Sequence, residues 1–327
     1  MRKIRLVLFG IVVGLAITEL VLSFVMPDLD FHFPPSRLSD AQFDRRAGEV
    51  RDGNGVRYAF DENGFRTIGA LQPDAGVRTV LFIGDSFTQG FGVNETETFA
   101  VATCARLAAH GIEARCLNAG VNGFGTVHEL RLLRKLLQRR DLAVDAVVFQ
   151  TCPSNDLRDN WEDGGFGFED EKLVEWDPPH IPLPVRMRGA LLENSYLHRS
   201  RIAKLLANAW FDAMPRDDRS DPSTFALERR LLQEVVATTQ ARAIPIVMIV
   251  AAPSWDVGRA SHEPHDEAAR LNFVAATAQE LNVPWIDSRK IAPKPELYIE
   301  NDGHFSAAGN ALIGEAVGDQ LAPLLRR

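Results

Sequence analysis

Residues 78–88 read Arg-Thr-Val-Leu-Phe-Ile-Gly-Asp-Ser-Phe-Thr, and this stretch indicates the fold class. Its first seven residues form an apolar run that ends in a turn, which is typical of a parallel strand covered on both faces. Further strands are predicted at 112–118, 145–151, 244–252 and 283–286. Helical spacing is found at 98–109, 126–139 and 306–325. This alternation predicts a three-layer α/β/α domain around a central parallel sheet of about five strands.

The composition sets limits on the class of protein. The chain has 327 residues, 46% hydrophobic and 24% charged, with a formal net charge of −8. These values exclude a disordered, collagen-like or coiled-coil chain, and the negative charge argues against binding of duplex nucleic acid. Three cysteines are too few for a disulfide scaffold or a four-thiolate zinc site. Cys104 and Cys116 either pair or remain buried thiols, and Cys152 is expected to serve packing.

The N-terminal segment differs from the rest of the chain. Leu6–Met26 contains a single charged residue, Glu19, and as a helix it would be about 31 Å long, close to the thickness of a bilayer's hydrocarbon core. Basic residues precede it, which predicts a cytoplasmic tip at residues 1–5 and translocation of the chain after Met26. The alternative is a cleavable signal peptide, but residues 23–27 lack a small-x-small cleavage site. Glu19 is expected either to face a partner helix or to be hydrated near the outer interface.

The remaining chain divides into two parts. Residues 27–75 are rich in Pro, Asp, Arg and Gly and predict a juxtamembrane arm. Residues 76–327 form the α/β domain, with an insertion at about 157–240, because the third and fourth strands are far more widely separated than a crossover requires. This insertion is either a lid near the mouth of the site or a loop with helical decoration.

Four clusters of polar residues fall where ligands bind in an open α/β sheet, outside the carboxyl ends of its strands. Ser86, Gly120 and Asn155 come after the first three strands, and each alone also fits a helix N-cap or an ordinary turn. Asp302 stands two residues before His304, just ahead of the last helix. In a loop, this spacing can bring the carboxylate to one imidazole nitrogen while the other is left to act as a general base.

Together, in this order, the four clusters resemble the blocks of the SGNH/GDSL hydrolase superfamily, which supply a Ser, a Gly, an Asn and a His. The resemblance covers about residues 60–320 and includes a Gly64-Phe65-Arg66 lead-in like that of anchored bacterial members. Phe87 replaces the Leu of the first block, and Pro153 stands where the third usually has Gly. The Asp-x-His spacing is similar to the alginate-type O-acetyltransferase branch, since the family's commoner Asp-x-x-His would need an Asp at Asn301.

The resemblance implies a flavodoxin-like domain and a Ser-His-Asp mechanism without a metal or organic cofactor. Ser86 would attack an acyl ester, His304 would take and return its proton, and Asp302 would orient His304. The Ser86 and Gly120 N–H groups and the Asn155 side chain would form the oxyanion hole. The resemblance also favours a bacterial inner-membrane protein, anchored through Leu6–Met26, with its catalytic domain in the periplasm.

The expected function is hydrolysis of O-acyl esters, chiefly acetyl esters, on a small molecule or on a cell-envelope or exported glycan. One alternative is an O-acyltransferase that uses the same triad with a sugar hydroxyl as acceptor. A further alternative is a catalytically inactive glycan-binding module. Protein partners are not predicted, and nucleic acid is not expected as a ligand. Residues 262–266 contain two His and two acidic residues, but a solvated helix start is favoured over a metal site.

Overall fold

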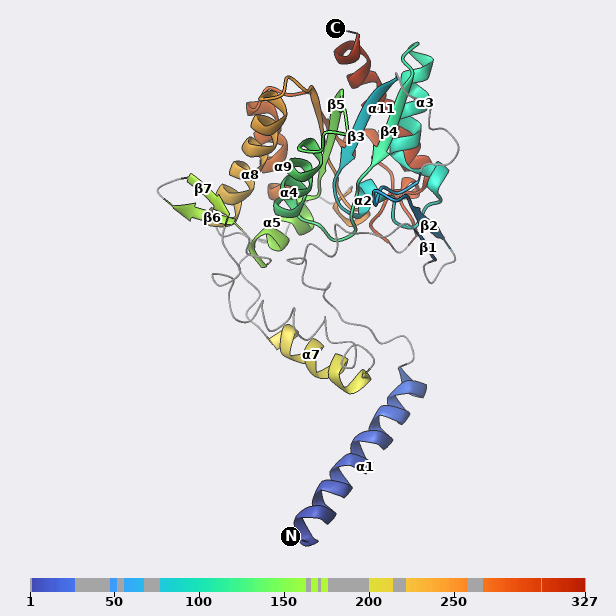
Figure 1. Cartoon of the computed structure of the whole chain (residues 1–327), viewed down its shortest axis with the longest axis vertical. Helices are drawn as coiled ribbons and strands as arrows, with labels where there is room; N and C mark the ends of the chain where they lie inside the picture. The colour runs from blue at the N-terminus through green and yellow to red at the C-terminus, as the bar shows by residue number, and fades with distance from the viewer. Residues whose placement is uncertain are drawn as a thin grey trace.

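A computed structural model provides the structure of the protein. It describes residues 2–26, 48–51, 56–67, 77–162, 166–169, 172–175, 200–213, 222–257, 267–300 and 302–326. Figure 1 shows a layered α/β body, with helix α1 (Arg2–Val25) extending away from it and α7 (Arg201–Ala213) near the end of α1 that is closer to the body.

The central sheet has five parallel strands in the order β4-β3-β5-β8-β9, as the sequence predicts. Their bounds are β3 Arg78–Ile83, β4 Ala114–Asn118, β5 Ala146–Thr151, β8 Ile246–Val250 and β9 Trp285–Asp287. The chain passes from β3 outward to β4 and then returns to β5 on the other side of β3. The carboxyl ends of β3 and β5 therefore mark the switch point of this flavodoxin-like order, where doubly wound sheets bind their ligands.

Helices cover both faces of the sheet (Figure 1). One layer contains α4 (Thr126–Leu137), α5 (Pro153–Glu162), α8 (Pro222–Gln240) and α9 (Glu267–Glu280). The other contains α3 (Phe99–Ala109) and α11 (Ala307–Leu325). In β3, Leu81 and Ile83 pack against the first layer, while Val80 and Phe82 pack against the second. Burial on both faces explains why the strand is a continuous apolar run.

Shorter elements lie around this frame. They are the helices α2 (Ser86–Gln89) and α10 (Ser288–Ile291), and the hairpins β1 (Gly48–Arg51) with β2 (Arg57–Phe60) and β6 (Phe166–Glu169) with β7 (Lys172–Glu175). Among the described residues, 3-10 turns span Glu95–Glu97, Ser254–Asp256 and Pro295–Leu297.

The predicted insertion at 157–240 extends too far at both ends. At its amino end, α5 continues to Glu162 and buries Leu157 in the first helix layer. Helix α8 lies within those bounds, yet its Leu231 and Val235 are fully buried in the core of the first helix layer. It is therefore part of the α/β frame, because the sheet's apolar face needs this helix to exclude water. Within the described residues, the inserted part contains the β6–β7 hairpin and α7.

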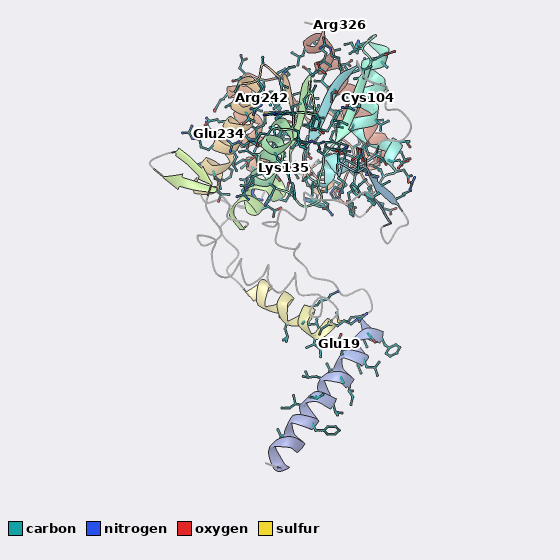
Figure 2. All side chains as sticks on the ribbon, viewed as in Figure 1. Glu19, Cys104, Lys135, Glu234, Arg242 and Arg326 are labelled. Carbon is teal, nitrogen blue, oxygen red and sulfur yellow. A yellow bond between two sulfur atoms is a disulfide. The ribbon has the colours of Figure 1, made fainter. Side chains whose placement is uncertain are left out.

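The segment before the domain also contributes to its packing. The peptide N–H of Arg66 donates to the Asn118 carbonyl at 2.8 Å, and Arg66 itself is buried. Residues 57–67, which the sequence places in the arm, thus pack on the end of β4. Cys104 of α3, labelled in Figure 2, and Cys116 of β4 form a disulfide, so the paired alternative is the correct one. Cys152 is buried and takes no part in a disulfide.

In α1, side chains are described at Val7 and from Phe9 onward, and those of Phe9–Thr18 are exposed. Among the residues with described side chains, no helix is long and apolar enough to cross a membrane.

Candidate active site

Ser86 lies at the turn between β3 and α2. Asp85 is the N-cap residue of α2, and its carboxylate accepts the Phe87 N–H at 2.9 Å. The interpretation of Ser86 as a helix N-cap is therefore wrong, because the neighbouring Asp85 fulfils that function. Ser86 is the first residue of the helix, and its hydroxyl remains available for a different partner.

That partner is His304, in the loop before α11. The Ser86 Oγ and the His304 Nε2 are 2.6 Å apart, and the His304 Nδ1 lies 2.5 Å from the Asp302 Oδ1. The same Asp302 oxygen accepts the His304 backbone N–H at 2.9 Å. The side-chain hydrogen bond from His304 lowers the pKa of Asp302, so the carboxylate stays ionised and can stabilise an imidazolium. The structure thus joins three predicted residues into one hydrogen-bonded chain.

The surroundings of His304 fix its orientation. The phenyl rings of Phe87 and Phe91 each lie with their centroids 4.7 Å from that of the imidazole. The His304 carbonyl accepts the Ile299 N–H at 2.9 Å, and the Ser254 hydroxyl donates to the Asp302 carbonyl at 3.2 Å. These hydrogen bonds therefore hold the loop around Asp302 and His304.

The predicted oxyanion donors lie around Ser86. The Ser86 N–H belongs to the first turn of α2 and so has no carbonyl partner within the helix. Gly120 packs directly on this helix, since a Cβ added there would lie 2.2 Å from the Gln89 nitrogen. The Gly120 N–H donates to the Asn118 Oδ1 at 3.0 Å, while the Asn155 amide donates to Asp159 at 3.3 Å. Both N–H groups already donate to acceptors within the protein. Each would therefore donate to a substrate oxyanion in addition to, or in place of, its present acceptor.

Arg66 braces the turn that carries Ser86, a function that the sequence analysis does not assign to it. Its guanidinium donates to the carbonyls of Gln89, Gly90 and Val93, and it lies 4.5 Å from the centroid of the Tyr58 ring. A planar group with several donors suits this cluster of carbonyls at the end of α2. The Gly-Phe-Arg lead-in is the one sequence signal that points to it.

Four buried carboxyl groups interact with one another beside Ser86, and they lie on the β3–α2 turn, α4, α5 and α8. Burial raises the pKa of Asp85 to about 6 and that of Glu228 to about 7. Burial and neighbouring carboxylates raise the pKa of Glu129 and of Asp156 well above their usual range. Asp156 still accepts the Thr151 hydroxyl at 2.7 Å and the Cys152 N–H at 2.6 Å, so it braces the end of β5.

The metal-like segment 262–266 and Asn301 lie outside the described residues. Within the described part of the chain, no group of three or more His, Cys, Asp or Glu side chains is arranged to hold a metal ion.

Comparison with known proteins identifies the class. The sequence pattern of the GDSL-like Lipase/Acylhydrolase family matches residues 82–312, more than half of the chain. The chain therefore belongs to this family of ester-hydrolysing enzymes, as the sequence resemblance predicts. No curated protein matches it.

Solved structures with a similar fold include two esterases. One is the psychrotrophic esterase EstA from Pseudoalteromonas sp., with 13% identity, a TM-score of 0.45 and coverage of 76% of this chain and 100% of that one. The other is Axe2, an acetylxylan esterase from Geobacillus stearothermophilus, with 16% identity and a TM-score of 0.44. The match covers 75% of this chain and 94% of the Axe2 chain.

Proposed function

We propose that the protein removes O-acetyl groups from sugar hydroxyls through an acyl-enzyme on Ser86. The observation that carries this proposal is the hydrogen-bonded chain from Ser86 through His304 to Asp302. A Ser-His separation beyond hydrogen-bond reach would have favoured the alternative of an inactive glycan-binding module. The 2.6 Å distance argues against that alternative.

The geometry supports a two-stage acyl-enzyme reaction. The Ser86 Oγ attacks the acetyl carbonyl carbon while its proton passes to the His304 Nε2, and Asp302 stabilises the resulting imidazolium. The bond from the acetyl carbon to the sugar oxygen then breaks, and His304 gives the proton to that oxygen. Water attacks the acetyl-Ser86 ester, His304 accepts a proton from the water, and acetate leaves with Ser86 reprotonated.

An exposed aromatic ring beside the triad supports a sugar as leaving group. Trp255 is 47% exposed, and a Cβ added to Gly303 would lie 2.4 Å from its ring. Gly303 stands between Asp302 and His304, so the indole borders the catalytic loop. A flat apolar ring with one polar N–H offers a surface against which the apolar face of a pyranose can pack.

The substrate class is tested by comparing an acetylated xylo-oligosaccharide with vinyl acetate, which has no ring to stack. We expect Trp255→Ala to raise KM for the oligosaccharide about tenfold, a loss of about 1.4 kcal/mol, and to leave vinyl acetate hydrolysis unchanged. Trp255→Phe should restore much of the affinity. Equal effects of Trp255→Ala on both esters would refute the sugar subsite.

Transfer to a second sugar hydroxyl remains the alternative reaction, and the Asp-x-His spacing favours it. Water and a sugar hydroxyl would attack the same acetyl-Ser86 ester. Adding an unacetylated oligosaccharide to the assay distinguishes them, because a transferase forms acetylated acceptor at the expense of free acetate. We expect acetate to remain the main product.

We also propose that Leu6–Met26 anchors the chain in a bacterial inner membrane, with the catalytic domain in the periplasm. The apolar sequence and the basic residues before it support this orientation. The Cys104–Cys116 disulfide supports an oxidising compartment. Protease added to spheroplasts should digest the domain and leave a membrane-bound N-terminal fragment. A domain that stays protected until the membrane is lysed would contradict this orientation.

A further inference from the structure

Glu19, the one acidic residue of α1, contacts the beginning of α7. Its carboxylate accepts the backbone N–H groups of Arg201 and Ile202 at 2.6 and 3.1 Å, and the Ser200 hydroxyl at 2.9 Å. The Arg201 guanidinium donates back to the Met26 carbonyl at 3.3 Å. Figure 2 shows Glu19 on the side of α1 that faces α7.

These contacts complete the N-terminus of α7. The first N–H groups of a helix have no carbonyl partner within it, and a negative charge at this end is favourable. The Ser200 Oγ accepts the Ala203 N–H at 3.2 Å, and Glu19 accepts the two N–H groups before it. A side chain from a different helix thus accepts two of these three N–H groups, which explains why the apolar part of α1 carries one carboxylate.

The surfaces of the two helices differ in a way that indicates their surroundings. Every side chain of Phe9–Thr18 in α1 is exposed, although most of them are apolar. An apolar helix without a polar side is typical of a membrane span. The sequence of α7 has polar residues at 201, 204, 208 and 212, a spacing that is typical of a helix with one polar side. Leu206 lies away from that side and is 66% exposed.

We propose that α7 is a membrane-surface helix that Glu19 latches to α1, and this rests on the membrane anchor proposed above. One polar side and a broad apolar side are the features of a helix that lies in the headgroup region of a bilayer. Because α7 belongs to the insertion between β5 and β8, the latch would hold the insertion on the bilayer beside the anchor. The catalytic domain would then face the membrane with one fixed side.

The proposal is tested with single fluorescent probes in the full chain. Leu206→Cys and Ile11→Cys are each labelled with the fluorophore NBD, because the native cysteines are either paired or buried. The labelled chains are reconstituted into vesicles of phosphatidylcholine and phosphatidylglycerol. We expect the emission maximum of both probes to shift to shorter wavelength. Aqueous iodide should quench each probe at least about threefold less in vesicles than in the same labelled chain in buffer without vesicles or detergent.

The latch is tested by adding Glu19→Ala to each labelled chain, with Thr18→Ala as the matched control. The Thr18 hydroxyl bonds the Gly14 carbonyl within α1, so its loss leaves α7 in place. We expect Glu19→Ala to restore iodide quenching at position 206 and to leave position 11 protected.

Three results would overturn different parts of the proposal. A protected position 11 with an accessible position 206 in the parent chain refutes the surface helix and leaves the anchor intact. Two accessible positions refute the anchor and the surface helix together. Unchanged protection at position 206 in Glu19→Ala refutes the latch.

Discussion

At the scale of single residues, the triad depends on one carboxylate oxygen. The Asp302 Oδ1 accepts both the backbone N–H and the ring Nδ1 of His304, which fixes the imidazole with its Nε2 toward Ser86. The oxygen therefore determines both the position of the ring and the tautomer that can act as a base.

Replacing this carboxylate by an amide tests that dependence. We expect Asp302→Asn to keep the fold but to lower kcat for p-nitrophenyl acetate by about 10³–10⁴, because the amide favours the wrong tautomer of His304. Steady-state hydrolysis and thermal unfolding of the variant give the two readouts. A loss of less than tenfold would mean that Asp302 does not orient the base.

The sequence is informative about residues whose function depends on local spacing. Asp302 and His304 are two residues apart, and Ser86 lies in the turn that follows a strand, so both patterns can be recognised in the sequence. The function of Arg66 is not visible there, because it comes from three carbonyls that lie 23 to 27 residues away in the chain. Such long-range contacts leave no periodic signal.

At the scale of elements, the strand ends bring the site together. Gly120 comes after β4 and Ser86 after β3, and the parallel pairing of these strands places the two residues side by side. Apolar runs make β3, β5 and β8 predictable, and the alternation of strands with helices indicates β4 and β9. Helix α8 is not predicted as part of the α/β frame. The interval between β5 and β8 is long, and no sequence signal within it marks where the insertion ends and the frame begins again.

The close approach of the β4 loop to α2 allows no side chain at position 120. We expect Gly120→Ala to push the loop away from Gln89 and to lower kcat by about 10²–10³ through loss of an oxyanion donor. Gly111→Ala is the control, since a φ of 75° is strained for alanine but the added Cβ would meet no atom within 4 Å. That variant should lose stability and keep its kcat, and the same kcat loss in both variants would contradict this explanation.

At the scale of the whole molecule, the buried carboxyl groups make folding sensitive to pH. Glu228 has a pKa of about 7 in the folded chain and about 4.5 when unfolded, because burial disfavours its charge. At pH values between about 4.5 and 7, the folded state binds more protons than the unfolded state. The free energy of unfolding therefore falls as the pH rises through this range. Composition cannot reveal this effect, because an acidic residue in a helix usually faces water.

Glu228→Gln should therefore flatten the pH dependence of stability. For the parent chain, this group alone lowers the free energy of unfolding by about 3 kcal/mol between pH 4.5 and 7. Urea unfolding over that range gives the slope, and Glu234→Gln, at a partly exposed position of the same helix, is the control. An unchanged slope in Glu228→Gln would show that the folded protein holds no extra proton there.

Covalent trapping shows directly whether Ser86 is the nucleophile. The full chain is incubated with a phosphonate ester that reacts with activated serines, and intact mass and peptide mass are then measured. We expect one adduct per chain, located on Ser86, in step with complete loss of esterase activity, and none on Ser86→Ala. An adduct at another residue, or undiminished hydrolysis by Ser86→Ala, would show that Ser86 is not the nucleophile.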